Sequence, residues 1–167
     1  CLKDLGCTLV FEPGRVISGN AGIMVTRVLY GKENEEKRFV IIDAGMNDLI
    51  RPALYQAYQG VRAVEEAVQS RPRRKIDLVG PVCESGDYLA KDRELPELKR
   101  DDLLAIMSSG AYGFTMASNY NSRPRPAEIL VHGNDYHIIR ERESYADLIR
   151  GETIPAFITG ESDRDGR

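Results

Sequence analysis

Residues 25–43 read VTRVLYGKENEEKRFVIID, two apolar runs rich in β-branched residues on either side of seven mostly charged residues. Valine, isoleucine, phenylalanine and tyrosine favour extended backbone. The Gly31–Lys37 segment between the runs is polar and contains a glycine, as a turn does. This pattern predicts two strands, Val25–Tyr30 and Arg38–Asp43, paired as a hairpin. The fold is therefore expected to be built on paired β-strands.

Similar short apolar runs, bounded by turn-forming residues, continue toward the carboxy terminus. They predict strands at Gly60–Ala67, Ile76–Val82, Asp102–Ser108, Ala127–His132 and Tyr136–Arg142. Gly133–Asp135 should join the last two strands, Leu49–Tyr58 should hold a short helical turn broken at Pro52, and Arg71–Lys75 is interpreted as a basic loop. Many short strands with turn signals indicate an antiparallel sheet that closes or folds over. The expected class is mainly β with some helix (α+β).

The two ends of the chain carry their own signals. Cys7–Phe11 is apolar and runs into Glu12-Pro-Gly-Arg15, a pattern typical of a buried strand that ends at a turn. Ser18–Thr26 is predicted to begin as a short helix capped by Ser18, and Ser144–Arg150 as another capped by Ser144. From Gly160 onward the sequence is polar and charged, which favours a disordered tail.

Composition narrows the class of partner. The 167 residues are 42% hydrophobic and carry a net charge of −3, without the broad basic field that nucleic acid or an anionic membrane would require. No apolar run approaches the roughly 18 residues of a membrane span, and the start lacks a secretion signal, so the cytoplasm is the expected compartment. Metal-ligand spacing is also missing among the cysteines and histidines, so no metal site is predicted: Cys1, Cys7, Cys83, His132, His137.

Glu12-Pro-Gly-Arg15 is the first candidate site. It combines a flexible turn with a guanidinium group and the start of a helix, which is how proteins often hold anions. A plain strand-ending turn is the alternative. Gly14–Gly19 faintly resembles a nucleotide phosphate loop, but Asn20 stands where the lysine of that motif belongs, so that interpretation is rejected.

The loop Gly80-Pro-Val-Cys-Glu-Ser-Gly-Asp87 is a sharper candidate, because it displays a thiol and a carboxylate side by side after a strand. Cys83 could act as a nucleophile or a proton donor, although a cysteine more often packs as a small apolar residue. A cysteine hydrolase would need an oriented histidine. His132 and His137 lie near a turn without a visible orienting group, so this function is disfavoured.

Two further loops could carry function. Tyr112 stands between Gly110 and Gly113, so its phenol could approach a ligand with little steric obstruction, unless it simply packs against the loop. Arg51 and Tyr55 are four residues apart and would share one face of a helical turn. The alternative for Arg51 is an ordinary surface arginine.

Four of these segments, in this order, resemble the carboxy-terminal part of the alanine-racemase-like pyridoxal-phosphate decarboxylases, and most closely the diaminopimelate decarboxylases. They are Glu12-Pro-Gly-Arg15, Asp43-Ala-Gly-Met-Asn-Asp-Leu-Ile-Arg-Pro-Ala-Leu-Tyr55, Gly80-Pro-Val-Cys-Glu-Ser-Gly-Asp87 and Gly110-Ala-Tyr-Gly113. The match runs from about Phe11 to Ile154. The resemblance implies a fold-type III enzyme, with residues 1–26 as the last strand and helix of a (β/α)8 barrel and residues 27–155 as an antiparallel β-barrel or sandwich domain. Residues 156–167 would be a polar tail.

The resemblance also implies a role for each matching residue. Residues of the first turn and Tyr112 would contact pyridoxal 5'-phosphate: Glu12, Pro13, Gly14, Arg15, Tyr112. The substrate would be bound by Arg15, Arg51, Tyr55, Glu84 and Tyr112. Cys83 corresponds to the proton donor of the family. These enzymes are obligate homodimers in which the Cys-Glu loop enters the neighbouring protomer's site, so a composite active site is implied.

The implied reaction converts meso-2,6-diaminopimelate to L-lysine and carbon dioxide. Arg15 and Arg51 could pair the distal carboxylate of this substrate through planar, charge-assisted contacts, and Glu84 could meet its ammonium group. Ornithine and arginine decarboxylases are the alternative. They resemble this chain but place aspartate after the cysteine and lack the Ile-Arg-Pro-Ala-Leu-Tyr segment.

The amino terminus bears on whether the chain acts alone. It begins with Cys1 and runs at once into a strand-like segment, so we expect a piece of something longer. The family's Schiff-base lysine belongs to the amino-terminal barrel, and no lysine here matches its motif: Lys3, Lys32, Lys37, Lys75, Lys91, Lys99. The isolated chain is therefore expected to be inactive. A stand-alone β-domain that dimerises or binds a protein is the alternative from a different class.

Overall fold

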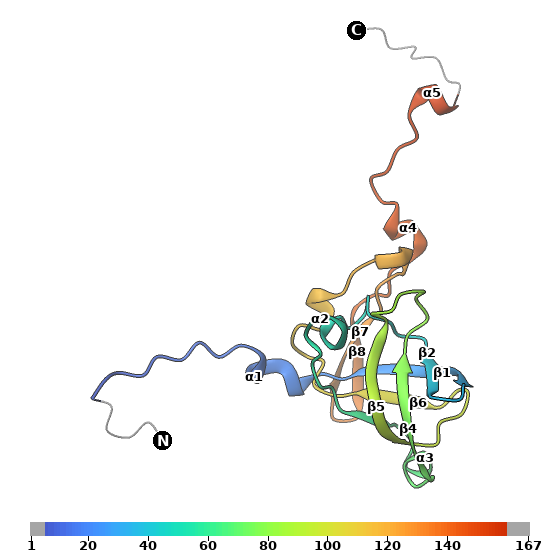
Figure 1. Cartoon of the computed structure of the whole chain (residues 1–167). Coiled ribbons are helices and arrows are strands. Elements are labelled where there is room, and N and C mark those ends of the chain that lie inside the picture. The colour runs from blue at the N-terminus through green and yellow to red at the C-terminus, as the bar shows by residue number, and fades with distance from the viewer. Residues whose placement is uncertain (1–5, 160–167) are drawn as a thin grey trace. The chain divides into compact units, whose positions relative to one another are not determined.

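The computed structural model describes residues 6–159 and divides the chain into two compact units that meet between Ser118 and Asn119. The first unit holds a six-stranded sheet and the second a two-stranded sheet (Figure 1). Within the described residues, no helix is long and apolar enough to cross a membrane. The predicted mainly β class with some helix is confirmed.

The first unit contains short helices in the connections between its strands. Its elements are α1 (Arg15–Ser18), η1 (Gly19–Ala21), β1 (Met24–Glu33), β2 (Arg38–Ile42), α2 (Arg51–Tyr55), β3 (Val61–Ala63), α3 (Glu66–Gln69), β4 (Arg73–Val79), β5 (Tyr88–Pro96), β6 (Leu103–Ile106) and η2 (Phe114–Met116). The strands lie in the order β3-β6-β1-β2-β4-β5. Every neighbouring pair is antiparallel except β2 and β4, which are parallel. The antiparallel sheet expected from the sequence is confirmed, with this one parallel pair as an exception.

The two ends of the strand order, β3 and β5, contact each other and nearly close the sheet into a barrel. Arg93 in β5 makes the connection: its Nη1 donates a 2.9 Å hydrogen bond to the backbone oxygen of Gln59, just before β3. The same guanidinium group lies 3.9 Å from the ring centroid of Tyr58. A cation above an aromatic face adds electrostatic attraction to that bond.

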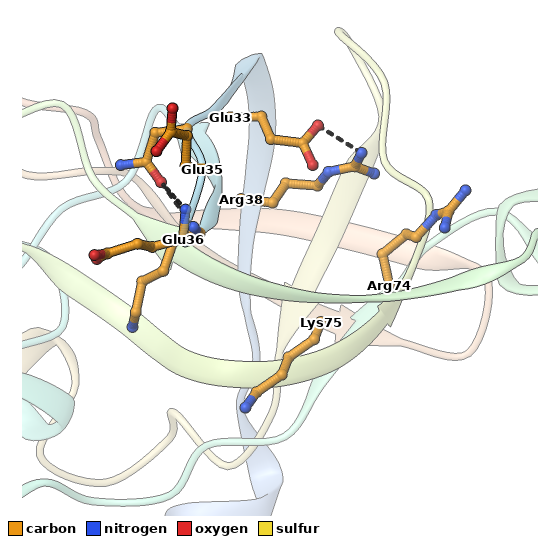
Figure 2. A pocket seen from close by; sticks show the side chains of 8 residues that line it. Glu33, Glu35, Glu36, Arg38, Arg74 and Lys75 are labelled. Atoms are coloured by element: carbon orange, nitrogen blue, oxygen red, sulfur yellow. Dashed lines mark hydrogen bonds and ion pairs between the residues drawn. The ribbon is translucent and has the colours of Figure 1, made fainter.

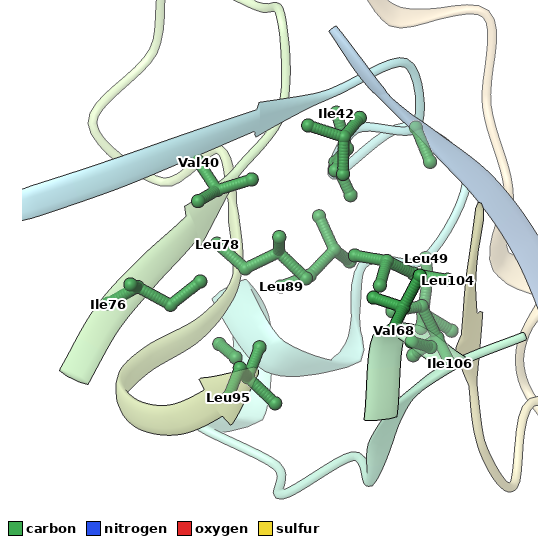
Figure 3. Packing of buried hydrophobic residues seen from close by; sticks show 14 residues of the cluster. Val40, Ile42, Leu49, Val68, Ile76, Leu78, Leu89, Leu95, Leu104 and Ile106 are labelled. Carbon is green, nitrogen blue, oxygen red and sulfur yellow. The ribbon is translucent and has the colours of Figure 1, made fainter. Parts of the chain in front are cut away.

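The interior of the barrel is aliphatic (Figure 3). Strands contribute most of it, and Leu49 and Val68 enter from the connections on either side of β3. The most deeply buried large side chains include Ile42, Leu78, Leu89, Leu104 and Ile106. Burying one such side chain contributes about 1.5–3 kcal/mol, so the core fixes the strand ends from which the loops emerge.

The hairpin predicted from Val25–Tyr30 and Arg38–Asp43 is present. β1 and β2 pair antiparallel with Val28 opposite Ile42 and Glu33 opposite Arg38. The turn is closed by the side-chain oxygen of Asn34, which accepts a 2.7 Å hydrogen bond from the backbone N–H of Lys37. The predicted helical turn in Leu49–Tyr58 is confirmed as α2, which has Pro52 in its first turn.

In the middle of the chain, one prediction is wrong and one strand was missed. Arg71–Lys75 is not a loop, because β4 begins at Arg73 and its charged side chains stay exposed while the backbone pairs with β5. Strand β5 was not predicted at all. Asp92 has φ +50° at an irregular point of the ladder, which breaks the alternation of apolar and polar residues that marks a strand. The strand predicted at Gly60–Ala67 is short, since only Val61–Ala63 pairs and α3 follows.

The amino-terminal strand is also absent from the structure. Cys7–Phe11 has no regular structure and is exposed, because no strand of residues 6–159 lies beside it to exchange backbone hydrogen bonds. The short helix predicted within Ser18–Thr26 is present as η1 with Ser18 at its N-cap position, although the Ser18 side chain makes no capping hydrogen bond. A further helical turn, α1, precedes it from Arg15. β1 then begins at Met24, so the expected division between residues 26 and 27 falls inside this strand and stays a prediction.

The second unit contains η3 (Tyr120–Ser122), β7 (Glu128–His132), β8 (Asp135–Arg140), α4 (Tyr145–Leu148) and α5 (Ala156–Thr159). The predicted hairpin is confirmed, with Val131 opposite Tyr136 and Gly133 at φ +60° in the turn. The predicted Ser144 cap is confirmed too: Ser144 and Asp147 form a reciprocal capping box. The expected polar tail begins with α5, and its part from Gly160 onward lies outside the described residues.

Candidate active site

Arg51 and Tyr55 lie one helical turn apart on α2, as their spacing predicts. The guanidinium carbon of Arg51 is 5.5 Å from the ring centroid of Tyr55 and 5.7 Å from that of Tyr112. Both distances are within the range of a cation–π interaction. Arg51 is half-buried, so this guanidinium is held between two phenols and is not an ordinary surface arginine.

Tyr112 also contacts the first candidate turn. A Cβ atom added to Gly14 would lie 3.2 Å from the Tyr112 hydroxyl oxygen, so the phenol reaches the Gly14 backbone. Tyr112 has φ +56°, a strained conformation for a residue with a side chain. The surrounding loop therefore imposes this orientation on the ring. The structure brings together residues from three segments far apart in the sequence: Gly14, Arg51, Tyr55, Tyr112.

Close backbone contact fixes the Tyr112 loop against η1. A Cβ on Gly22 would lie 2.6 Å from the Cα of Gly110, so only glycine permits this approach. The backbone N–H of Ser109 donates to the oxygen of Gly22 at 2.8 Å. Arg15 joins the same region, since its Nη2 donates a 3.2 Å hydrogen bond to the oxygen of Ser108. The Arg15 and Tyr112 segments thus share one rigid frame.

Buried polar atoms in this region lack protein partners. Within residues 6–159, the Nε atoms of Arg15 and Arg51 are buried and make no hydrogen bond. Buried donors of this kind are usually satisfied, and each exception calls for an explanation. Two guanidinium groups, a phenol and an open glycine backbone suit an anionic ligand such as a phosphate or a carboxylate. The described residues contain no group of three His, Cys, Asp or Glu side chains that could hold a metal ion.

Cys83 and Glu84 lie on the connection between β4 and β5, and both are exposed. Within the described part of the chain, the Cys83 thiol makes no hydrogen bond or disulfide. The structure does not bring Cys83 into contact with Arg51 or Tyr112 within one chain. The loop instead approaches the turn before α2, because a Cβ on Gly86 would lie 3.6 Å from the methyl carbon of Met46.

Sequence reasoning missed the buried polar residues that shape this turn. Asn47 and Asp48 are buried, and Asp48 Oδ2 accepts a 2.8 Å hydrogen bond from the backbone N–H of Gly45. Asp87, at the end of the Cys-Glu loop, is buried as well. The available signal was a glycine close to an aspartate in both segments, Gly45 three residues before Asp48 and Gly86 directly before Asp87, which is typical of turns organised by a carboxylate.

A hollow elsewhere on the surface contains none of the predicted site residues (Figure 2). It lies at the β1–β2 turn, where Arg38 Nη2 bonds to Glu33 Oε2 at 2.7 Å. The remaining lining residues are polar or charged: Asn34, Glu35, Glu36, Lys37, Arg74, Lys75. Hydrogen bonds within the turn account for this arrangement, so the hollow is not the candidate site.

Comparison with known proteins identifies the class to which this sheet and site belong. Residues 10–110 match the family model of the pyridoxal-dependent decarboxylase, C-terminal sheet domain. The match covers more than half of the chain and includes the whole six-stranded sheet. The chain therefore belongs to the pyridoxal-dependent decarboxylase family, of which it contains the carboxy-terminal sheet domain.

The relatives within this family carry a more particular name. A diaminopimelate decarboxylase of Pseudomonas aeruginosa is 58% identical over 156 residues, which are 91% of this chain and 35% of that protein. The crystal structure of the M. jannaschii diaminopimelate decarboxylase in complex with L-lysine has 42% identity and a TM-score of 0.82, covering 87% of this chain and 33% of that one. The Helicobacter pylori enzyme complexed with L-lysine has 47% identity and a TM-score of 0.77. The match covers 89% of this chain and 36% of that one. The chain spans about a third of the length of the curated relatives it matches.

Proposed function

We propose that this chain is the carboxy-terminal part of a diaminopimelate decarboxylase, which converts meso-2,6-diaminopimelate to L-lysine and carbon dioxide as the last step of lysine biosynthesis. The observation that carries the proposal is the position of the Arg51 guanidinium between the rings of Tyr55 and Tyr112, whose hydroxyl lies against Gly14. Residues from three separate motifs meet there. The similar proteins of Pseudomonas aeruginosa and Helicobacter pylori are diaminopimelate decarboxylases, which supports the same activity.

Gly14 and Tyr112 suit the cofactor of the family. Pyridoxal 5'-phosphate, when bound, supplies the electron sink that allows carbon dioxide to leave the α-carbon. The Glu12-Pro-Gly-Arg15 turn would hold the phosphate through its backbone, because glycine at position 14 places no side chain of its own over that backbone. The Tyr112 phenol would border the cofactor from the opposite segment.

Arg15, Arg51, Tyr55 and Glu84 would select the substrate. The distal carboxylate of diaminopimelate would satisfy guanidinium donors of Arg15 and Arg51, whose Nε atoms have no partner among the described residues. Tyr55 would add its hydroxyl, and Glu84 would pair the distal ammonium group. Ornithine lacks the distal carboxylate, so it would leave the buried Nε donors of these two half-buried arginines without a partner, which is costly.

Cys83 would donate the proton that replaces the carboxylate on the α-carbon. Its thiol is exposed on the β4–β5 connection and unbonded within residues 6–159, so it can approach a second molecule. In a homodimer, the Cys83–Glu84 loop of one protomer would complete the site of its partner. The enzyme would work in the cytoplasm, and the isolated chain would be inactive because no lysine of the sequence serves the Schiff base.

The test is lysine formation from meso-diaminopimelate with added pyridoxal phosphate, comparing this chain alone with the chain joined to an upstream barrel. Activity is expected only in the joined protein. Cys83→Ala should abolish it, whereas Asp101→Asn, at an exposed side chain just before β6, should keep it.

Three results would contradict the proposal. Formation of L-lysine by the short chain would show that it does not need the Schiff-base lysine of the barrel. A higher kcat/KM for ornithine or arginine than for diaminopimelate would favour the other decarboxylases of the family. Inactivity of the joined protein, together with dimer formation by the short chain, would favour a non-catalytic domain.

A further inference from the structure

Asp87 connects two loops through its carboxylate. Its Oδ1 accepts a 2.6 Å hydrogen bond from the backbone N–H of Met46, and its Oδ2 accepts a 2.6 Å bond from the backbone N–H of Val82. Met46 belongs to the turn that leads to α2, whereas Val82 directly precedes Cys83. The residue is 4% exposed, so water does not compete for these bonds. One side chain thus joins the segment of Arg51 to the segment of Cys83.

The Cys83–Glu84 loop is also closed around Asp87 by its own backbone. The backbone N–H of Gly80 donates to the backbone oxygen of Asp87 at 3.0 Å, and the backbone N–H of Asp87 donates to the backbone oxygen of Glu84 at 3.0 Å. Glycines make room for the carboxylate. A Cβ on Gly80 would overlap both carboxylate oxygens, and a Cβ on Gly45 would lie 3.1 Å from Oδ1. The side chain therefore fits a slot that admits little displacement.

The two sides of this connection are not equally dependent on Asp87. The turn before α2 has its own support, since Asp48 accepts from the Gly45 N–H at 2.8 Å and Leu49 is fully buried. Cys83 and Glu84, on the other side of the connection, are exposed. Loss of the carboxylate should therefore shift Cys83 more than Arg51.

We propose that Asp87 is a positioning residue that holds Cys83 at a fixed place relative to the turn carrying Arg51. This inference rests on the proposed function, because it takes Cys83 as the proton donor. Asp87 itself touches no substrate. Its effect should appear mainly in kcat, through the proton-transfer step, and less in KM, because Arg51 on the better supported α2 still binds the substrate although Glu84 moves with Cys83.

The kinetic experiment uses the full-length enzyme with two different perturbations. Asp87→Asn keeps the shape but replaces one acceptor by an N–H donor that faces a backbone N–H. Gly80→Ala keeps the carboxylate but displaces it. Each should lower kcat about 10- to 100-fold, since a small misplacement of a reacting group costs up to that much. KM should change by a smaller factor than kcat, and the solvent deuterium isotope effect on kcat should rise as protonation becomes limiting.

Matched controls separate this effect from general damage. Asp101→Asn changes an aspartate whose side chain is 68% exposed, and Gly31→Ala adds a methyl group with only an ordinary contact, 3.7 Å from the Phe39 oxygen. Both should leave kcat and the isotope effect unchanged. Amide hydrogen exchange adds a readout independent of activity. Exchange at Met46 or Val82 should accelerate in Asp87→Asn and not in the controls.

The outcomes distinguish the inference from the proposed function. If the unmodified enzyme forms no lysine, the proposed function fails, and faster exchange at Met46 or Val82 in Asp87→Asn would still support the connection. If the unmodified enzyme is active but both Asp87→Asn and Gly80→Ala keep its kcat and isotope effect, the inference is overturned. If Asp87→Asn does not fold, Gly80→Ala decides the kinetic question.

Discussion

Arg93 Nη1 donates a 2.9 Å hydrogen bond to the backbone oxygen of Gln59, and this bond connects the two end strands of the six-stranded sheet. No ladder of backbone hydrogen bonds joins β3 to β5 in the described residues. The seam between them therefore depends on a side chain, which makes it sensitive to single substitutions.

Replacing Arg93 should open this seam. Arg93→Ala removes a charge-assisted hydrogen bond and the contact with the Tyr58 ring, so the free energy of unfolding should fall by about 1.5–3 kcal/mol. Urea unfolding followed by circular dichroism measures it. Arg62→Ala, at an exposed position of β3, is the control and should change stability by less than about 0.5 kcal/mol. Equal losses in both variants would contradict the role given to Arg93.

An apolar residue should replace Gln59 without lowering the free energy of unfolding. Its side chain is 1% exposed, and within the described part of the chain neither amide atom has a hydrogen-bond partner. An unsatisfied buried polar group costs about 1–3 kcal/mol, so Gln59→Met should keep or raise stability.

Gln69→Met is the matched contrast for that substitution. The Gln69 Nε2 donates a 2.8 Å bond to the oxygen of Ala63, and its loss should lower stability by about 1 kcal/mol. Chemical denaturation of both variants gives the answer, and a destabilised Gln59→Met would show that its amide is satisfied in solution.

The second unit should loosen in acid through Glu143. Hydrogen bonds from the Arg125 side chain, then from its backbone N–H, lower the pKa of Glu143 from 4.5 to about 2. Since the folded pKa lies below the unfolded one, the stabilisation is complete above about pH 4.5 and is lost as the pH falls toward 2. The carboxyl carbon shift of Glu143, followed by NMR across this range, should titrate with a midpoint well below 4.5.

The Arg125 contact can be separated from general acid effects. Glu143→Gln removes the titrating group and should flatten the pH dependence of stability of residues 119–159 between pH 4.5 and 2. A variant that keeps the full acid sensitivity would assign the effect to other carboxylates.

Gly14 and Tyr112 should be energetically coupled in the full-length enzyme. Gly14→Ala places a methyl group 3.2 Å from the Tyr112 hydroxyl and should displace the phenol. Tyr112→Phe removes that hydroxyl and relieves the contact. In a double-mutant cycle on kcat/KM, the paired variant should lose less than the sum of the single losses by about 0.5–3 kcal/mol. Additive losses would mean that the two residues act independently.

The sequence allowed the hairpins and the four motifs to be predicted because both depend on local patterns. The β1–β2 turn, the Ser144 cap and the Arg51–Tyr55 spacing are set by residues within one or two turns of each other. Strand β5 escaped prediction because Asp92 interrupts its alternation. Cys7–Phe11 was assigned to a strand because its composition fits one, yet a strand exists only where a neighbour pairs with it.

The candidate site divides in the same way. Cys83, Glu84 and Tyr112 could be proposed from the sequence, because their residue types and the motifs that contain them are local features; their roles stay predictions. The role inferred for Asp87 depends on two backbone N–H groups that are 36 residues apart in the chain and meet only after folding. No local sequence pattern indicates that these two N–H groups lie close together, so the buried carboxylates of this region were missed.

The single parallel pair, β2 with β4, sets the order in which the molecule can assemble. The β1–β2 and β4–β5 hairpins are local and can form early, whereas a parallel pair requires a long crossover to close first. That crossover, residues 43–72, contains α2 and Arg51. The arginine therefore reaches its place between the two phenols only when the hairpins dock. A chain stalled before docking would show nearly native strand content by spectroscopy and still lack a site.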